Sequence, residues 1–352
     1  MGSALIVASI ASAGCHKKAA PTSPTSPTGP AGTEVEPLQN AASASGRLVG
    51  AAVQSAYLAD SRYAGVLSRH FNYLTAEYEM KWGTIGRTQG AYDFSGGDAI
   101  AGFAAAHGMQ LKGHALIWHG SVPGWVNGLP PSEMHDVFET YIRTVAEHYR
   151  GRVLAWDVVN EAVADDGSGL RDTVFRQKLG DQYIADAFRL AHQADPDAML
   201  FYNDYNGEGL NAKSNRIYDL VKGLLAQGVP IHGVGLQMHI TASNPPAAAS
   251  VSANLRRLAD LGLTVNFSEM DVRISSLPGT PQSRLDAQKS VYHTIVATCV
   301  AEPRCHAVTF WGFTDAHSWI DSQFGPDDPL LFDEQYAPKP AVYGVLDAFW
   351  RR

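Results

Sequence analysis

Two glutamates in this sequence lie at the ends of strand-like runs that also carry amide and aromatic side chains. Glu161 closes the run WDVVNE at 156–161, and Glu269 lies in the run SEMDVR at 268–273. Two carboxyl groups about 5–5.5 Å apart cleave a glycosidic bond with retention of configuration, one as nucleophile and the other as acid and base. Indole rings stack on the apolar faces of sugars, and amides bond adjacent hydroxyls. The residue types therefore predict glycoside hydrolysis at a site that holds both glutamates.

Other strand-like segments end in similar runs of polar and aromatic residues. These runs are EYEMKW at 77–82, GHALIWH at 113–119, NDYN at 203–206, QMH at 237–239 and WGFTDAHSW at 311–319. A polar residue at a single strand end is more often a loop contact or a helix cap than a catalyst. Seven segments that converge on carboxylates, amides, imidazoles and indoles are better explained by one shared site.

The elements that would position these residues alternate between strands and helices. Strand-like runs cover 48–54, 73–80, 110–119, 153–161, 199–206, 233–239, 264–272 and 307–315, and helical spacing is clear at 132–149, 211–227 and 286–301. This alternation predicts an α/β protein with a parallel sheet, and eight strands fit a (β/α)8 TIM barrel, with a doubly wound open sheet as the alternative. Such barrels carry their active sites at the carboxyl ends of the strands, where the polar runs fall. No glycine-rich phosphate loop follows a strand, so nothing marks a nucleotide site.

The composition excludes several classes of protein. The 352 residues allow one large domain or two or three ordinary ones, and 45% apolar residues exclude disorder of the whole chain. Lys and Arg number 27 against 35 Asp and Glu, a net charge of −8, so the chain is a poor binder of nucleic acid. Three cysteines exclude a disulfide-built scaffold and a cysteine-rich metal module.

The sequence carries no standard metal-binding spacing. His114 and His119 are five residues apart on one predicted strand, which turns them to opposite faces and argues against a shared ion. We therefore expect neither a metal nor a cofactor.

The first 36 residues differ from the rest of the chain. Residues 1–15 resemble an export segment, with small apolar residues at 4–13 before Cys15, although Ser12 stands where a lipoprotein signal usually has leucine. Residues 16–36 form a linker rich in proline, threonine and serine, and 37–352 would be the catalytic barrel. We expect a secreted protein or one that is lipid-anchored through Cys15 at the bacterial cell envelope; a misassigned start codon is the alternative.

Taken together, the motifs resemble glycoside hydrolase family 10, the endo-β-1,4-xylanases. The resemblance covers about residues 46–350 and rests on GHALIWH, WDVVNEA, NDYN, GVGLQMH, SEMDVR, WGFTDAHSW and LLFDEQYAPKPAVYGV in the family order. It implies that Glu161 is the general acid/base and Glu269 the nucleophile. It further implies that Asn160 bonds the 2-hydroxyl of the sugar under attack, and that His239 and Asp271 orient Glu269.

The resemblance also implies the walls of the sugar subsites and the supporting residues. On the nonreducing side these are His114, Trp118, Gln237, Trp311 and Trp319, with polar contacts from Glu77 and Lys81; Tyr205 and Asn206 are candidates on the leaving-group side, and His119 and Asp157 would support the site from behind. Many family members carry a disulfide in the segment that holds Cys299 and Cys305. The expected partners are xylan and xylo-oligosaccharides, bound by a monomer without a cofactor.

The sequence departs from the family where a sugar-binding asparagine usually stands, since Tyr78 follows Glu77. This change predicts a reshaped second subsite on the nonreducing side. Ser121 replaces a frequent glutamine, and Ser268 replaces a threonine. Another retaining β-1,4-glycanase, such as a cellulase or mannanase, and a non-catalytic carbohydrate-binding barrel are the alternative functions.

Overall fold

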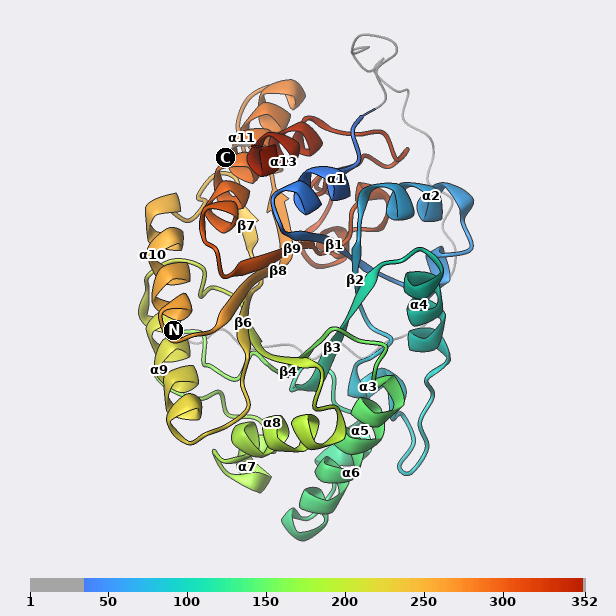
Figure 1. Ribbon diagram of the computed structural model, residues 1–352, viewed down its shortest axis with the longest axis vertical. Coiled ribbons are helices and arrows are strands. Elements are labelled where there is room, and N and C mark those ends of the chain that lie inside the picture. Colours follow the sequence, from blue (N-terminus) through green and yellow to red (C-terminus); the bar gives the residue numbers. More distant parts are fainter. Residues whose placement is uncertain (1–34, 351–352) are drawn as a thin grey trace. The chain divides into compact units, whose positions relative to one another are not determined.

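A closed barrel of parallel strands lies at the centre of the molecule, with helices around it (Figure 1). The structure is a computed structural model that describes residues 35–350, and the statements below concern those residues. Its strands are β1 (Leu48–Val53), β2 (Tyr73–Ala76), β3 (Gln110–Trp118), β4 (Ala155–Asn160), β5 (Met199–Asp204), β6 (Gly233–Leu236), β7 (His239–Thr241), β8 (Thr264–Arg273) and β9 (Cys305–Phe310). Neighbours pair in the order β6-β5-β4-β3-β2-β1-β9-β8, and pairing of β6 with β8 closes the ring. The predicted (β/α)8 barrel is confirmed, and the doubly wound sheet is excluded.

Helices surround the barrel; most of them connect successive strands, while the first precedes β1 and the last two follow β9. They are α1 (Leu38–Ala44), α2 (Ser61–His70), α3 (Trp82–Ile85), α4 (Ser95–Ala106), α5 (Gly124–Asn127), α6 (Pro131–Tyr149), α7 (Val174–Leu179), α8 (Tyr183–Ala194), α9 (Ala212–Ala226), α10 (Ala248–Ala259), α11 (Pro281–Ala301), α12 (Trp319–Phe324) and α13 (Pro340–Trp350). The predicted helix at 286–301 begins five residues earlier. Thr280 caps α11 by accepting the Ser283 amide, and Pro281 takes the first helical position, where it needs no amide hydrogen.

The predicted strand at 233–239 is interrupted, so that β6 and β7 replace one continuous strand. Met238 has φ 66°, in the left-handed region that an extended strand cannot contain. The break leaves β7 paired with β8 alone, in the register His239 to Asp271. Other predicted strands also end early, among them 153–161, where Glu161 has φ 58°, and 307–315, where Gly312 has φ 97°. Each early end lies beside a predicted site residue.

Large side chains pack between the barrel wall and the surrounding helices, as Trp156 does against Tyr149 of α6. Trp156 of β4 is fully buried, and Gly113 of β3 makes room for its ring. A Cβ atom at Gly113 would lie 2.1 Å from the indole, so no larger residue fits there without displacing Trp156. This glycine of the GHALIWH run thus serves the packing between the barrel wall and the surrounding helices.

The two cysteines near the last barrel strand form a disulfide. Cys299 in the last turn of α11 and Cys305 at the start of β9 are bonded, with their Cα atoms 5.2 Å apart. Both residues are buried. The disulfide that the family resemblance implied is therefore present.

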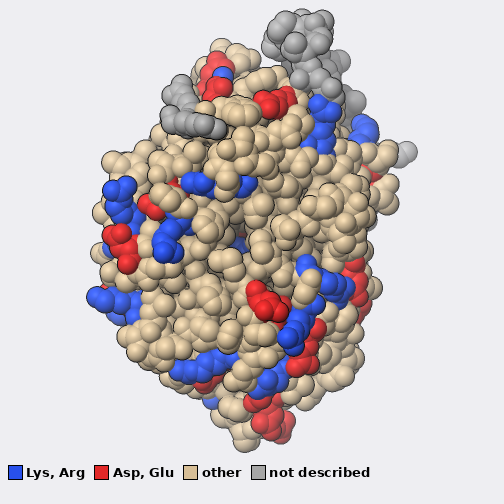
Figure 2. Space-filling model, in the orientation of Figure 1, with Lys and Arg blue, Asp and Glu red and all other residues tan. Residues whose placement is uncertain are grey.

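The expectations for the N-terminal segment lie outside the described residues. They concern the export signal, the linker and lipidation of Cys15. Within the described residues, no helix combines the length and apolar character that a bilayer crossing requires. On the face shown in Figure 2, acidic and basic side chains are interspersed, and no continuous basic patch is present.

Candidate active site

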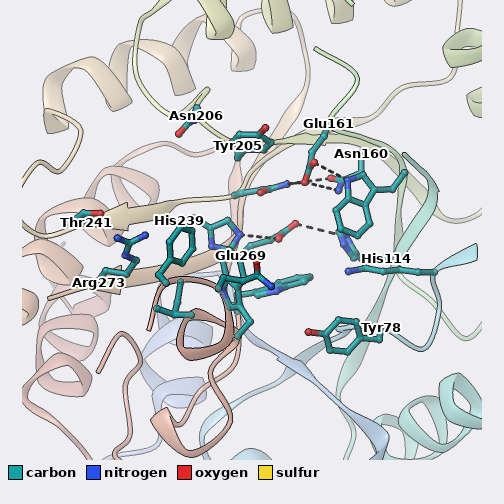
Figure 3. A pocket seen from close by; sticks show the side chains of 18 residues that line it. Tyr78, His114, Asn160, Glu161, Tyr205, Asn206, His239, Thr241, Glu269 and Arg273 are labelled. Atoms are coloured by element: carbon teal, nitrogen blue, oxygen red, sulfur yellow. Dashed lines mark hydrogen bonds and ion pairs between the residues drawn. The ribbon is translucent and has the colours of Figure 1, made fainter. Parts of the chain in front are cut away.

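A cavity of about 540 Å³ opens where the barrel strands end, and both predicted catalytic glutamates line it (Figure 3). The other lining residues come from seven barrel strands or the loops that follow them, from β7 and from α12: Tyr78, Lys81, His114, Trp118, Asn160, Tyr205, Asn206, Gln237, His239, Thr241, Arg273, Trp311, Trp319, Ile320, Gln323 and Phe324. The parallel strands all point their carboxyl ends toward this cavity, which is why residues far apart in the sequence meet there.

Glu161 receives its hydrogen bonds from neutral donors. The indole of Trp118 donates to Oε2 at 2.8 Å, and the amide of Gln237 donates to Oε1 at 3.0 Å. The Asn160 amide donates to the same Oε1 at 3.2 Å. The left-handed backbone at Glu161 costs on the order of 1–3 kcal/mol. Such a conformation persists only where neighbouring contacts hold it, and it is a common feature of functional sites.

Glu269 is almost fully buried among positively charged groups. Burial alone would raise the pKa of its carboxyl, but His114, His239 and Lys112 outweigh burial and lower this pKa to about 2. The Nε2 atom of His239 lies 3.2 Å from Oε2, and the Nδ1 atom of His114 lies 3.9 Å from Oε1. The carboxyl is therefore ionised at neutral pH, the state that a nucleophile needs.

His239 lies between two carboxylates and keeps its own proton. Its Nδ1 atom is 2.8 Å from Oδ2 of Asp271, and the indole of Trp319 donates to the same oxygen at 2.9 Å. Burial would lower the pKa of His239, yet Asp271 and Glu269 raise it to about 10. The imidazolium therefore donates to Glu269 on one side and to Asp271 on the other.

Asn203 of β5 connects the two halves of the site. Its amide nitrogen donates to Glu269 Oε1 at 2.6 Å and to Asn160 Oδ1 at 2.8 Å, so both amide hydrogens are used. The hydroxyl of Ser268 donates to Oδ1 of Asn203 at 2.6 Å and fixes the amide orientation. Ser268 thus keeps the hydroxyl of the threonine that it replaces, in a buried bond.

Glu269 and two buried neighbours have a ligand-like arrangement. His114, Asp157 and Glu269 each offer an atom, and these atoms lie within 4.8 Å of one another. The ammonium of Lys112 already lies 2.6 Å from Asp157 Oδ2, and His114 Nδ1 lies 2.9 Å from that oxygen. Lys112 thus supplies the positive charge that an ion would bring, and His114 and Lys112 act on the Glu269 carboxyl electrostatically.

Lys81 is enclosed by aromatic rings at the opposite wall. Its ammonium lies 4.4 Å from the ring centroid of Trp118, 5.2 Å from that of Tyr78 and 5.6 Å from that of Trp311. Burial lowers the pKa of Lys81, while Glu269, Glu77 and Glu161 act in the opposite direction. The arrangement fixes a hydrogen-bond donor beside flat surfaces that suit sugar rings.

The structure brings most of the predicted site residues to the cavity lining, with four exceptions. Glu77 is buried outside the lining and accepts from the Gln54 side chain at 3.1 Å, and burial raises its pKa. Asp157 and Asp271 lie behind Glu269 as described above. His119 follows β3 outside the lining, and burial lowers its pKa.

Several lining or supporting residues were not among the predicted ones. They are Asn203, Lys112, Thr241, Arg273, Ile320, Gln323 and Phe324. The alternation along β3 could have indicated Lys112, because it is two residues before His114 and shares its face. Arg273 lies with its guanidinium carbon 4.1 Å from the ring centroid of Phe324, a pairing between the end of β8 and the end of α12 that sequence spacing does not reveal.

Comparison with known proteins places this geometry in a family. The model of glycosyl hydrolase family 10 matches residues 37–348. Endo-1,4-beta-xylanase B of Thermotoga neapolitana is 42% identical over 289 residues, which cover 81% of this chain and 83% of the relative. The native xylanase 10B structure from Thermotoga maritima superposes with a TM-score of 0.85 at 42% identity, over 89% of this chain and 98% of that one. Xylanase 10B from Thermotoga petrophila RKU-1, solved in complex with xylobiose, gives a TM-score of 0.86 at 40% identity, over 90% and 98% of the two chains. The chain belongs to glycosyl hydrolase family 10.

Proposed function

We propose that this protein is a retaining endo-β-1,4-xylanase in which Glu269 is the nucleophile and Glu161 the acid/base. The observation that carries the proposal is the difference between the two carboxyl environments. Glu269 is buried against cationic groups that keep it ionised, whereas the hydrogen bonds to Glu161 come from an indole and two amides. Two carboxyls in such different environments suit two different roles.

The proposed reaction has two displacement steps. In the first, the Glu269 carboxylate attacks the anomeric carbon while Glu161 gives its proton to the departing glycosidic oxygen. In the second, Glu161 takes a proton from water, which then attacks the same carbon and releases the sugar from Glu269. Asn160, fixed by Asn203, lies beside both carboxyls and would bond the 2-hydroxyl of the sugar under attack.

The walls of the cavity support a neutral polysaccharide chain as substrate. Trp118, Trp311 and Trp319 supply indole surfaces around the carboxyl pair. The named relatives are xylanases, and one of them was solved with xylobiose. Xylan and xylo-oligosaccharides are therefore the proposed partners.

Chromatography of the products from xylan, carboxymethylcellulose and mannan tests this proposal. We expect fast release of xylo-oligosaccharides from xylan, slow or no release from the other two, and loss of turnover in Glu269→Ala. Faster hydrolysis of cellulose or mannan would assign the chain to another β-glycanase. Binding of xylan without turnover in the unaltered protein would make it a carbohydrate-binding barrel.

We further propose that the chain acts as an exported monomer, secreted or lipid-anchored through Cys15. The buried disulfide between Cys299 and Cys305 supports an oxidising compartment. Mass spectrometry of the Cys15 peptide from a membrane fraction tests the anchor, and an unmodified cysteine would contradict it. Light scattering of the purified protein tests the monomer, which a dimer mass would contradict.

A further inference from the structure

The segment that follows Glu161 folds back on itself and places Arg171 against the backbone of the acid/base. An antiparallel bridge between Val163 and Leu170 closes this turn. The Nε atom of Arg171 then donates to the carbonyl oxygen of Glu161 at 3.1 Å, and its Nη2 atom donates to the carbonyl of Val163 at 3.2 Å. The guanidinium therefore fixes the backbone segment that carries the Glu161 side chain.

The backbone at Glu161 needs such support because it is left-handed, with φ 58°. Its amide donates to the carbonyl of Asn203 at 2.8 Å, which ties one side of the residue to β5. Arg171 supplies the partner on the carbonyl side. Both peptide groups that flank the Glu161 side chain are thus fixed by hydrogen bonds.

The guanidinium is itself held by a network of charged and aromatic groups. Its Nη2 atom lies 2.7 Å from Oδ1 of Asp165 and donates to the Tyr205 hydroxyl at 3.0 Å. Tyr205 also bonds Asp165, and the ammonium of Lys213 lies 3.5 Å from the Tyr205 ring centroid and 2.9 Å from Asp204. The Arg171 side chain is only 18% exposed, so its guanidinium group has little freedom to rotate.

We propose that Arg171 is a positioning residue for proton transfer, which aims the Glu161 carboxyl at the glycosidic oxygen by holding the Glu161 carbonyl. The proposal rests on the proposed function, in which Glu161 is the acid/base. General acid catalysis depends on the geometry of the proton donor, and small displacements of a positioned group cost rate. Loss of Arg171 should therefore weaken protonation of the leaving group while the Glu269 nucleophile stays in place.

Two aryl β-xylobiosides distinguish this role from general support of the fold. A dinitrophenol leaves without protonation, whereas a methylphenol needs a proton from the acid. We expect Arg171→Met to lower kcat/KM on methylphenyl xylobioside by about 100-fold and on dinitrophenyl xylobioside by less than about threefold. Equal losses on the two substrates, or no loss on either, would overturn the proposal. The ratio of the two values does not depend on the fraction of the variant that folds.

Three further variants test whether the selective loss arises from the hydrogen bond between Arg171 and the Glu161 carbonyl. Arg171→Lys keeps the charge but loses the fork that reaches both carbonyls, and we expect a selective loss of the same kind. Tyr205→Phe removes the hydroxyl bound by Arg171 but leaves its bond to Glu161, so a selective loss as large as that of Arg171→Met would overturn the proposal. Arg189→Met removes a partly exposed arginine paired with Asp186 on α8, and it should leave both rates unchanged.

Glu161→Ala separates a failure of this inference from a failure of the proposed function. We expect it to reproduce the selective loss on methylphenyl xylobioside. If Glu161→Ala shows no selectivity, the acid/base assignment fails, and the inference fails with it. If Glu161→Ala is selective and Arg171→Met is not, only the role of Arg171 is contradicted.

Discussion

The Nε2 atom of His239 lies 3.2 Å from Oε2 of Glu269, so a partly buried imidazolium donates directly to the proposed nucleophile. Asp271 bonds the other ring nitrogen and keeps the ring charged. The pKa values of about 10 for His239 and about 2 for Glu269 are two consequences of this arrangement. Removing the imidazolium should therefore change the titration of Glu269.

We predict that His239→Asn moves the acidic limb of the kcat/KM profile to higher pH. The free enzyme must hold Glu269 ionised, so this limb follows the pKa of Glu269. Loss of the adjacent positive charge should raise that pKa by about one unit or more. Rates on a dinitrophenyl xylobioside across the acidic range measure the shift. His107→Asn, at an exposed histidine after α4, is the matched control. If the acidic limb of the kcat/KM profile is unchanged in His239→Asn, the ion pair between His239 and Glu269 is contradicted.

The same pair predicts how stability depends on pH. The folded pKa of His239 is raised from 6.5 to about 10, so its contribution is present below pH 6.5 and lost as the pH rises toward 10. The folded pKa of Glu269 is lowered from 4.5 to about 2, so its contribution is present above pH 4.5 and lost as the pH falls toward 2. Urea unfolding across pH 6.5–10 should show a smaller decline in the free energy of unfolding for His239→Asn than for the unaltered protein. If the free energy of unfolding declines equally in His239→Asn and in the unaltered protein, the imidazole of His239 is not charged in the folded protein.

Tyr78 should influence the length of the products. Its side chain is 46% exposed and lines the cavity beside Lys81, where the family usually has an asparagine. Tyr78→Asn replaces a ring surface with an amide, so we expect a changed ratio of xylobiose to xylotriose and a changed KM for xylotetraose. Tyr343→Asn, at a tyrosine of α13 with 44% exposure, is the control. Identical product profiles for Tyr78→Asn and the unaltered protein would show that the substitution does not reshape the subsite.

The disulfide should contribute to stability without contributing to catalysis. It closes a loop of six residues in sequence separation, which corresponds to about 2 kcal/mol. We expect the double variant Cys299→Ala/Cys305→Ala to lose about that much free energy of unfolding, and to keep its kcat on xylan at 25 °C. A reducing agent should lower the stability of the unaltered protein but not that of the variant. Equal stability of the two proteins without reductant would contradict the prediction.

The arrangement of the barrel could be predicted because parallel buried strands leave a strong apolar signal between helical patterns. Two of the positions where the prediction erred are backbone irregularities. Met238 and Glu161 both have a positive φ, which neither residue type favours, so the strand patterns at 233–239 and 153–161 ran past their true ends. Tertiary contacts impose these conformations, and a single sequence does not record them.

The candidate site was predictable where a run of polar and aromatic residues marks the end of a strand, and less so elsewhere. Glu161 and Glu269 could be chosen from their sequence runs. Lys112 could have been chosen because side chains alternate between the two faces of β3, which places Lys112 on the same face as His114. Arg171 lies ten residues after Glu161 in a turn without periodicity, and only the fold shows that its guanidinium returns to the Glu161 carbonyl. Glu77 shows the opposite case, since it follows a strand end but bonds Gln54 outside the cavity lining.

In the proposed function, Glu161 and Glu269 hydrolyse xylan chains by double displacement. Proton NMR of xylotetraose hydrolysis tests it most directly, because the spectrum shows which anomer forms first at the new reducing end. We predict that the β-anomer appears first and that the α-anomer follows by mutarotation. Initial formation of the α-anomer, or no hydrolysis of xylotetraose, would contradict the account.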